Sequence, residues 1–149
     1  MVNIIIGNKG SGKTKKLIEL TNQAVENSNG NVVVLDKGTK LNYDVTHKAR
    51  LINSDDYYID GFYSLYGFLG GICAGNYDVT DILIDSIFKI CDRDFNQLSE
   101  FLTKATNLSK KTNTNLYLVI SADKDELILE DNPDIKILNI ESINMSVTS

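Results

Sequence analysis

The sequence predicts an α/β fold with three layers, α/β/α, in which helices cover both faces of a mostly parallel five-stranded sheet. Short apolar runs alternate with segments of helical spacing along all 149 residues. The runs are apolar at nearly every position, as in parallel strands that are buried on both faces. We see no internal repeat and no long linker, so residues 1–149 are expected to form one domain.

Five apolar runs, each followed by polar residues, are the expected strands. In chain order they cover residues 2–6, 32–35, 82–84, 116–120 and 135–140. The segment Arg50–Asn53 has the length of a further, short edge strand. Because the carboxyl ends of parallel strands lie along one edge of a sheet, we expect ligands to bind there.

Three longer segments, residues 12–27, 60–74 and 94–111, have apolar residues at helical spacing. Asp92 and Asp94 are both candidate N-caps of the third helix. The second contains several glycines, each costing about 1 kcal/mol relative to alanine. We therefore expect this helix either to pack closely through its glycines or to be partly mobile. A short helix is expected within residues 123–130.

The segment between the first strand and the first helix reads GNKGSGKT and fits G-x-x-x-x-G-K-[ST], the phosphate-binding P-loop. A strand before the motif and a helix after it is the context in which it binds phosphate. The alternative is a glycine-rich turn with a chance Gly-Lys-Thr. The predicted phosphate-binding residues are Gly7, Asn8, Lys9, Gly10, Ser11, Gly12, Lys13 and Thr14.

The residue types of this loop suit a polyphosphate ligand. Backbone N–H groups at a helix N-terminus form a nest for anions. Gly7, Gly10 and Gly12 allow backbone angles with positive φ and let the main chain approach the phosphates. Lys13 is expected to reach the β- and γ-phosphates in binding and catalysis, and the Thr14 hydroxyl to ligate Mg²⁺.

A P-loop protein usually has a second acidic residue, at the end of an apolar strand, that holds Mg²⁺ through water. Residues 81–85 offer Asp81 and Asp85, which four residues of strand separate by roughly 13 Å. Asp81 is expected to open the strand, and Asp85 to close it on the ligand side. We therefore predict that Asp85 is the metal carboxylate. The alternative is an aspartate that only ends the strand in a turn.

With residues 7–14 and 82–85 in hand, the chain resembles the P-loop NTPase superfamily over its whole length. Along the chain, a further strand lies between the P-loop strand and the Asp85 strand, and a strand that ends at Ser121 follows. This order is similar to that of the RecA-like branch. This resemblance implies the sheet order 5-1-4-3-2, with the expected strands numbered along the chain. The chain also resembles small bacterial ATP-binding proteins. Its start is similar to thymidine kinases, but Ser86 replaces their usual acidic residue and their zinc-binding cysteine pairs are missing.

Hydrolysis needs a group that orients water and positive charge that stabilises the transition state. Many RecA-like ATPases place a glutamate directly beside the metal aspartate, but this chain has Ser86 there. Others place it at the end of the neighbouring strand, where this chain has Asp36. Asp36 is therefore our candidate catalytic residue beside Lys13, and the alternative is a cap or turn aspartate. Arg50 and Arg93 are the only arginines of the chain, so a protein partner or a homo-oligomer is expected to supply an arginine. Side chains that can compensate phosphate charge are Lys9, Lys37, Lys40 and Arg93.

Composition narrows the partner classes. The chain has 20 acidic against 15 basic residues, which argues against nucleic acid as a partner. Cys73 and Cys91 lack metal-ligand spacing and are expected to be buried thiols. We see neither a signal peptide nor a run of membrane-span length, so we expect a cytoplasmic protein without a membrane partner.

Three functions are weighed. The favoured one is Mg²⁺-dependent binding of ATP or GTP with weak hydrolysis, as a switch or accessory ATPase. The second is a small-molecule or nucleoside kinase, against which the scarcity of arginine and the lack of a lid segment argue. The third is a non-catalytic partner-binding module. In that reading an aromatic cluster forms the partner surface. Otherwise we expect the cluster to pack in the core or half-exposed, or to stack an adenine base. The cluster consists of Tyr57, Tyr58, Tyr63 and Tyr66.

Overall fold

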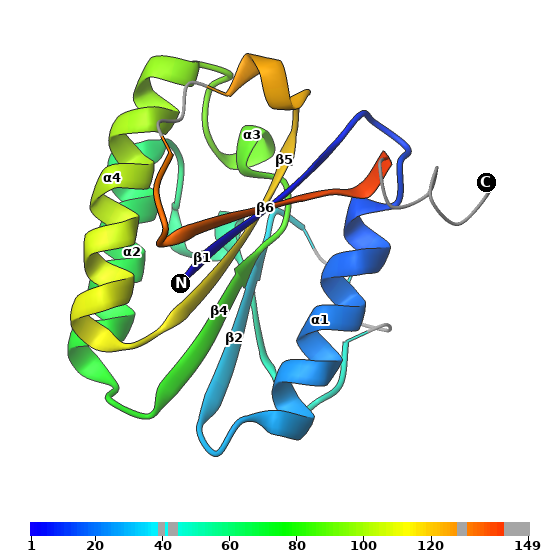
Figure 1. The fold of residues 1–149 in the computed structure, drawn as a ribbon. Helices are drawn as coiled ribbons and strands as arrows, with labels where there is room; N and C mark the ends of the chain where they lie inside the picture. Colours follow the sequence, from blue (N-terminus) through cyan, green and yellow to red (C-terminus); the bar gives the residue numbers. More distant parts are fainter. Residues whose placement is uncertain (39–40, 42–44, 128–130, 142–149) are drawn as a thin grey trace.

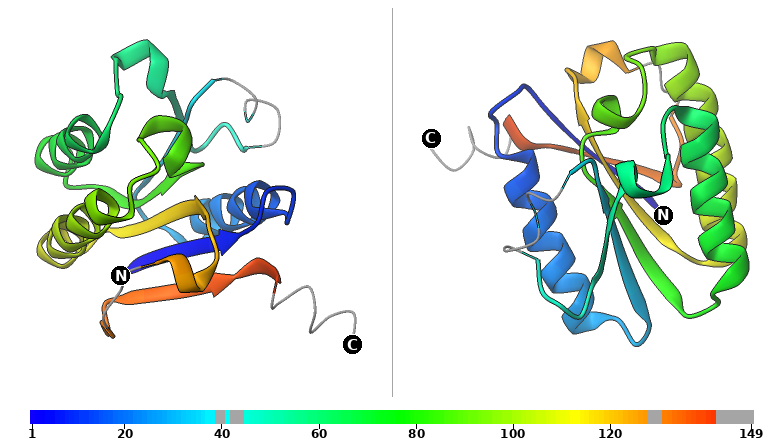
Figure 2. Two further views of the ribbon diagram at one scale, coloured as in Figure 1. Left: turned by 90° about the horizontal axis from the view of Figure 1, so that it is seen from above. Right: turned by 180° about the vertical axis from the view of Figure 1, so that it is seen from behind.

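Helices cover both faces of one sheet in the computed structural model, which describes residues 1–38, 41, 45–127 and 131–141 (Figure 1). Seen from above, α1 lies on one side of the sheet and α2 and α4 lie on the other (Figure 2). Every strand pairing within the described sheet is parallel. The α/β class and the mostly parallel sheet are therefore confirmed. The strands are β1 (Val2–Gly7), β2 (Asn31–Asp36), β3 (Arg50–Asn53), β4 (Val79–Ile84), β5 (Asn115–Ser121) and β6 (Ile135–Asn139).

The described sheet has six strands in the order β3-β2-β4-β5-β1-β6, so the expectation of five strands was wrong. The additional strand is β3, whose four residues pair with residues 33–36 of β2. It lies at the edge of the sheet, as expected for so short a segment. Its side chains alternate too weakly between apolar and polar for the sequence pattern to establish it as a full member of the sheet.

The three long helices appear with ends within two residues of the predicted ones. They are α1 (Lys13–Asn27), α2 (Phe62–Gly75) and α4 (Phe95–Thr112). One short helix, α3 (Ile87–Ile90), and a 3₁₀ turn at Ser54–Tyr57 were not predicted, because a single turn leaves no apolar period to detect. The expected short helix within residues 123–130 is a 3₁₀ turn at Lys124–Glu126, and residues 128–130 lie outside the described part.

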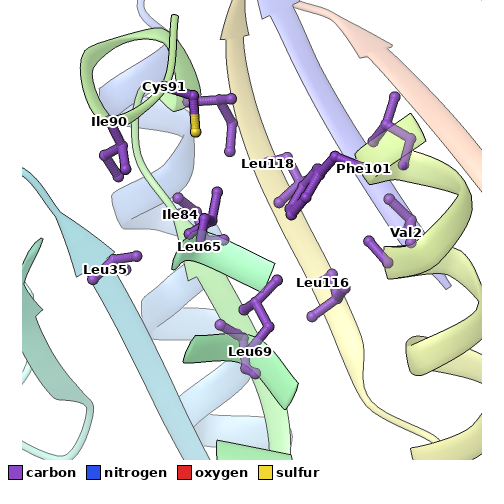
Figure 3. Packing of buried hydrophobic residues seen from close by; sticks show 14 of the residues in the cluster. Val2, Leu35, Leu65, Leu69, Ile84, Ile90, Cys91, Phe101, Leu116 and Leu118 are labelled. Carbon is purple, nitrogen blue, oxygen red and sulfur yellow. The ribbon is translucent and has the colours of Figure 1, made fainter. Parts of the chain in front are cut away.

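The strands are apolar at successive positions because each face of the sheet has its own core. Ile4 and Ile6 of β1 point into a cluster with α2 and α4, whereas Ile5 between them joins Leu17 of α1 on the opposite face. Figure 3 shows the larger cluster, in which Leu65 lies over the sheet. Because both faces of the sheet are buried, the strands lack the alternation of apolar and polar residues that strands with one buried face have.

The glycines of α2 do not bring the helix close to a neighbour. A Cβ atom built on Gly67, Gly70 or Gly71 would meet nothing within 4 Å, so the expectation of close packing through these residues was wrong. The helix instead buries its opposite, apolar face. Phe62 of that face lies 5.5 Å from Phe101 of α4, between ring centroids, and such aromatic pairs anchor one helix on another.

Replacing the N-cap of α4 is expected to destabilise the protein. Asp94 Oδ1 accepts hydrogen bonds from the backbone N–H groups of Asn96 at 3.0 Å and Gln97 at 3.1 Å. Asp94→Ala leaves both donors without this acceptor and should lower the free energy of unfolding by about 1 kcal/mol in urea denaturation. The exposed Asp92, the other candidate cap, is the control. An equal loss in Asp92→Ala would contradict this assignment.

Candidate functional site

The segment 7–14 forms the connection from β1 to α1 at the carboxyl edge of the sheet (Figure 1). Gly10 has φ of 82° and Gly12, the N-cap of α1, has φ of 96°, so both use the left-handed backbone that glycine allows. Gly7 does not use this freedom, since it is not among the residues with positive φ. A Cβ atom at Gly7 would instead collide with Ser11 Oγ, so the Ser11 side chain would have to move.

Lys13 lies beneath this loop and is only 7% exposed. Its Nζ donates a hydrogen bond to the backbone oxygen of Asn8 at 2.7 Å and a longer one to Ser11 Oγ at 3.5 Å. Burial lowers the pKa of Lys13, while the carboxylates of Glu141 and Asp85 act in the opposite direction. The loop therefore holds a cation at the N-terminus of α1, where the helix dipole also favours an anionic ligand.

One N–H group of the loop already has a carboxylate as its acceptor. The backbone nitrogen of Asn8 donates to Glu141 Oε1 at 3.2 Å. Glu141 follows β6, so the carboxyl end of a neighbouring strand contributes an acidic group to the loop. This contact indicates that at least one loop amide is directed toward an anion, as in a phosphate-binding nest.

The two predicted metal residues lie side by side. Thr14 Oγ1 is 3.4 Å from Asp85 Oδ1 and 3.3 Å from Asp85 Oδ2. Asp85 is fully buried directly after β4, and its backbone nitrogen donates to the Leu35 oxygen at 2.9 Å. A second hydroxyl, Ser86 Oγ, contacts Asp85 Oδ1 at 3.2 Å. Hydroxyl and carboxylate oxygens are the hard ligands that Mg²⁺ prefers, so this donor set fits the metal.

The other aspartate considered for the metal lies elsewhere. Asp81 is the third residue of β4 rather than its first, a small correction to the predicted strand. Its carboxylate faces Asn115 Nδ2 at 3.5 Å, at the beginning of β5. The burial of Tyr117 and the nearby charge of Asp81 together raise the pKa of that phenol. Asp81 therefore belongs to the opposite end of the sheet from the loop.

Asp36 lies at the carboxyl ends of the strands, as Asp85 does, but it does not line the pocket beside the loop. It ends β2, the strand next to β4, and the pairing of Leu35 with Ile84 places it beside the start of the Asp85 loop. The side chain is fully buried. It is not among the residues that line the pocket beside the loop of residues 7–14. A role for Asp36 in positioning water stays a prediction.

A pocket of about 770 Å³ opens beside the loop. One wall consists of residues 8–10 and 12–15. The facing wall comes from the segments after β4 and β5, and it contains Ser86, Lys89, Arg93, Ser121, Ala122 and Glu126.

The charge of this pocket is opposite to that of the whole chain. Its lining carries the basic side chains of Lys9, Lys13, Lys15, Lys89 and Arg93, against the carboxylate of Glu126. The net charge of the chain is −5. A concentration of cations on an acidic protein favours an anionic ligand at that place. Of the side chains expected to compensate phosphate, Lys9 and Arg93 line the pocket, Lys37 does not, and Lys40 lies outside the described residues.

The sequence did not predict that the charged residues of the facing wall lie together. Arg93 was considered only as one of several basic residues, and neither Lys89 nor Glu126 was singled out. Lys89 lies in the unpredicted helix α3. A signal for Glu126 existed, because Asp123 and Glu126 have the spacing of a capping box, and the structure contains that box. The signal predicts a turn, and it says nothing about the pocket that the turn borders.

The aromatic cluster lies away from this pocket. Tyr58 is 91% exposed and Tyr63 86% exposed, so packing in the core was wrong for both. None of the four tyrosines lines the pocket, which leaves the stacking of a base by them without geometric support. Lys104 Nζ instead lies 5.5 Å from the ring centroid of Tyr63 and 5.9 Å from that of Tyr66.

The cysteines do not form a second reactive site. Cys73 and Cys91 are free and buried, as expected. Burial, with Asp60 and Asp92 nearby, raises the pKa of Cys91 to about 12, so its thiol stays protonated at neutral pH and is a poor nucleophile. Among the described residues no group of three or more His, Cys, Asp or Glu side chains is arranged to hold a metal ion. In the same residues, no helix combines the length and the apolar character needed to cross a membrane.

Comparison with known proteins adds no assignment. No protein-family model matches the chain, and no curated protein matches it. The functional argument therefore depends on the loop, the pocket and the residues around them.

Proposed function

We propose that this protein is a P-loop NTPase of the RecA-like type that binds ATP or GTP with Mg²⁺ and hydrolyses it slowly. The observation that carries the proposal is the basic pocket, in which buried Lys13 and the N-terminus of α1 lie beside the Thr14–Asp85 pair. A triphosphate matches both the positive charge and the oxygen ligands of this arrangement.

The order of the strands supports the RecA-like part of the proposal. β5 lies between β1, which leads into the loop, and β4, which ends at the metal carboxylate. Without the edge strand β3, the order from the opposite edge is β6-β1-β5-β4-β2, which corresponds to the expected 5-1-4-3-2. Ser121 at the end of β5 lines the pocket, as expected where parallel strands bind ligands at their carboxyl ends.

Thr14 and Asp85 would hold Mg²⁺, Thr14 through its hydroxyl and Asp85 through water. The bound ion would offset the negative charge of the triphosphate. Lys13 binds the β- and γ-phosphates, and the loop amides orient them. Asp36 is the proposed water-positioning residue. A second copy or a protein partner that completes the site would raise the slow intrinsic rate.

A thermal-shift panel tests the proposal. Mg-ATP and Mg-GTP are each added to the wild-type protein, with and without EDTA, and phosphate release is then measured. Saturation at about 100 times the dissociation constant should raise the melting temperature by about 5 °C or more. The Mg²⁺ dependence of the shift reports on the metal.

The other two functions give different results in the same panel. Phosphate transfer to an added nucleoside or other acceptor, rather than to water, would identify a kinase. A melting temperature that no nucleotide changes would contradict nucleotide binding and leave the non-catalytic module.

A further inference from the structure

Arg93 is held across the pocket from the P-loop by three kinds of contact. Its Nη1 donates a hydrogen bond to the backbone oxygen of Ser121 at 2.6 Å, and its Nη2 forms an ion pair with Glu126 Oε2 at 3.0 Å. The guanidinium carbon lies 5.1 Å from the ring centroid of Phe88 and 5.2 Å from that of Phe95. The side chain is therefore positioned beside the pocket rather than extended into solvent, although it is 47% exposed.

Glu126 is oriented by contacts at both of its carboxylate oxygens. Its Oε1 accepts the backbone N–H of Asp123 at 3.0 Å, while its Oε2 faces Arg93. The hydrogen bond from the Asp123 backbone, together with Arg93, lowers the pKa of Glu126. The carboxylate thus remains ionised at neutral pH. It presents a negative charge to the same pocket that the loop and the lysines prepare for an anion.

We infer that Glu126 is an internal anion that occupies Arg93 in the free protein, and that the incoming triphosphate takes its place. This inference rests on the proposed function and deepens it. Carboxylate and phosphate oxygens suit the same face of a guanidinium group, so they compete for it. A half-exposed ion pair contributes little net stability, so a ligand of higher charge displaces it readily.

The consequence concerns the source of the arginine. The chain has its own arginine in the pocket, and Glu126 sets how tightly that arginine and the lysines bind phosphate. Glu126 lowers nucleotide affinity in two ways, because it occupies Arg93 and because it repels the triphosphate.

Glu126→Gln isolates this effect. The amide oxygen of glutamine keeps the capping hydrogen bond from Asp123, and its NH₂ group replaces the carboxylate oxygen that faces Arg93. The control is Asp134→Asn, which removes the acidic partner of Lys110, 3.2 Å away. Asp134 directly precedes β6, so it lies at the amino ends of the strands, opposite the loop. Both variants change the net charge equally, so any general effect of charge appears in the control.

Calorimetric titration with Mg-ATP and Mg-GTP measures the dissociation constants. Glu126→Gln should bind the nucleotide about 3- to 10-fold more tightly than the wild type, and Asp134→Asn within about 2-fold of it. Arg93→Ala should bind about 10-fold more weakly. Arg93→Lys keeps a charge and an apolar stem beside the phenylalanines, so its affinity should lie between those of the wild type and Arg93→Ala. In the Arg93→Ala background, the substitution Glu126→Gln should lose most of its effect.

The outcomes separate this inference from the proposed function. One set of results would overturn the inference but not the proposed function. In it, the wild type binds nucleotide and Lys13→Ala does not, while Glu126→Gln and both Arg93 variants have the affinity of the wild type. An equal gain from Glu126→Gln with and without Arg93 would also overturn it, since the gain would then be general repulsion. Failure of the wild type to bind either nucleotide would overturn both.

Discussion

Lys13→Ala is expected to weaken the binding of Mg-ATP or Mg-GTP by about 100-fold, or roughly 3 kcal/mol. The ammonium group is buried under the loop, 2.7 Å from the Asn8 oxygen, and borders the pocket. A charge-assisted bond in such a partly desolvated place is stronger than one at the surface. Calorimetric titration of the variant measures the loss.

The free Lys13→Ala protein should stay folded, which distinguishes a binding defect from unfolding. Burial lowers the pKa of Lys13 in the folded state below its unfolded value. The unfolded chain therefore binds this proton more tightly, and the stability contributed by this group rises as the pH passes through the window below 10.5. At neutral pH the buried charge opposes folding, so its removal should not lower the melting temperature of the free protein.

Two further variants complete this test. Lys13→Met keeps the apolar stem without the charge and should lose as much affinity as Lys13→Ala. Lys110→Ala removes an exposed lysine at the far end of α4 and should bind as the wild type does. If Lys13→Met binds nucleotide as tightly as the wild type, the P-loop proposal is wrong.

Asp85→Asn is expected to remove most of the Mg²⁺ dependence. The fully buried carboxylate lies 3.3 Å from Thr14 Oγ1 and is the predicted outer ligand of the ion. An amide of the same size keeps an oxygen for the hydroxyl contacts but lacks the charge that attracts the metal. The enhancement of nucleotide binding by Mg²⁺ and the rate of phosphate release should each fall by about 10- to 100-fold. Titrations with Mg²⁺ and with EDTA measure the first quantity.

Asp36→Asn is the matched comparison, since Asp36 is equally buried at the end of the neighbouring strand. It should retain the Mg²⁺ dependence that Asp85→Asn loses. A water-positioning role predicts that Asp36→Asn slows phosphate release without changing the dissociation constant. If Asp36→Asn loses the Mg²⁺ dependence and Asp85→Asn keeps it, our assignment of the metal to Asp85 is wrong.

The parts of the fold predicted from the sequence are those with local signals. Residues 13–27 and 95–112 are amphipathic over several turns, and Asp94 begins the second of these helices as a cap. The buried strands contain three to five successive apolar residues. Gly12 takes its left-handed angle because only glycine has no Cβ to oppose it. Each of these properties depends on neighbours in the chain.

The errors occurred where local signals are weak or misleading. β3 has only four residues, and pairing with β2 decides its membership in the sheet. Tyr63 is aromatic but exposed, because α2 directs a different face toward α4. Tyr58, which precedes α2, is exposed as well. The expected packing role of Gly67 and its neighbours failed for the same reason, since the sequence does not say which helix face meets a neighbour.

The sequence by itself determined the left-handed backbone of the loop at Gly10 and Gly12, because this conformation depends on consecutive backbone angles. The spacing of the glycines, Lys13 and Thr14 predicts the chemistry of the loop. The sequence also placed Asp85 at a strand end. Only the tertiary structure decided which side chains face the loop across the pocket. Arg93 and Glu126 are 33 residues apart and meet because the connections after β4 and β5, adjacent parallel strands, leave the sheet at the same edge. The order of strands in a sheet depends on contacts between distant segments, and no local pattern specifies it.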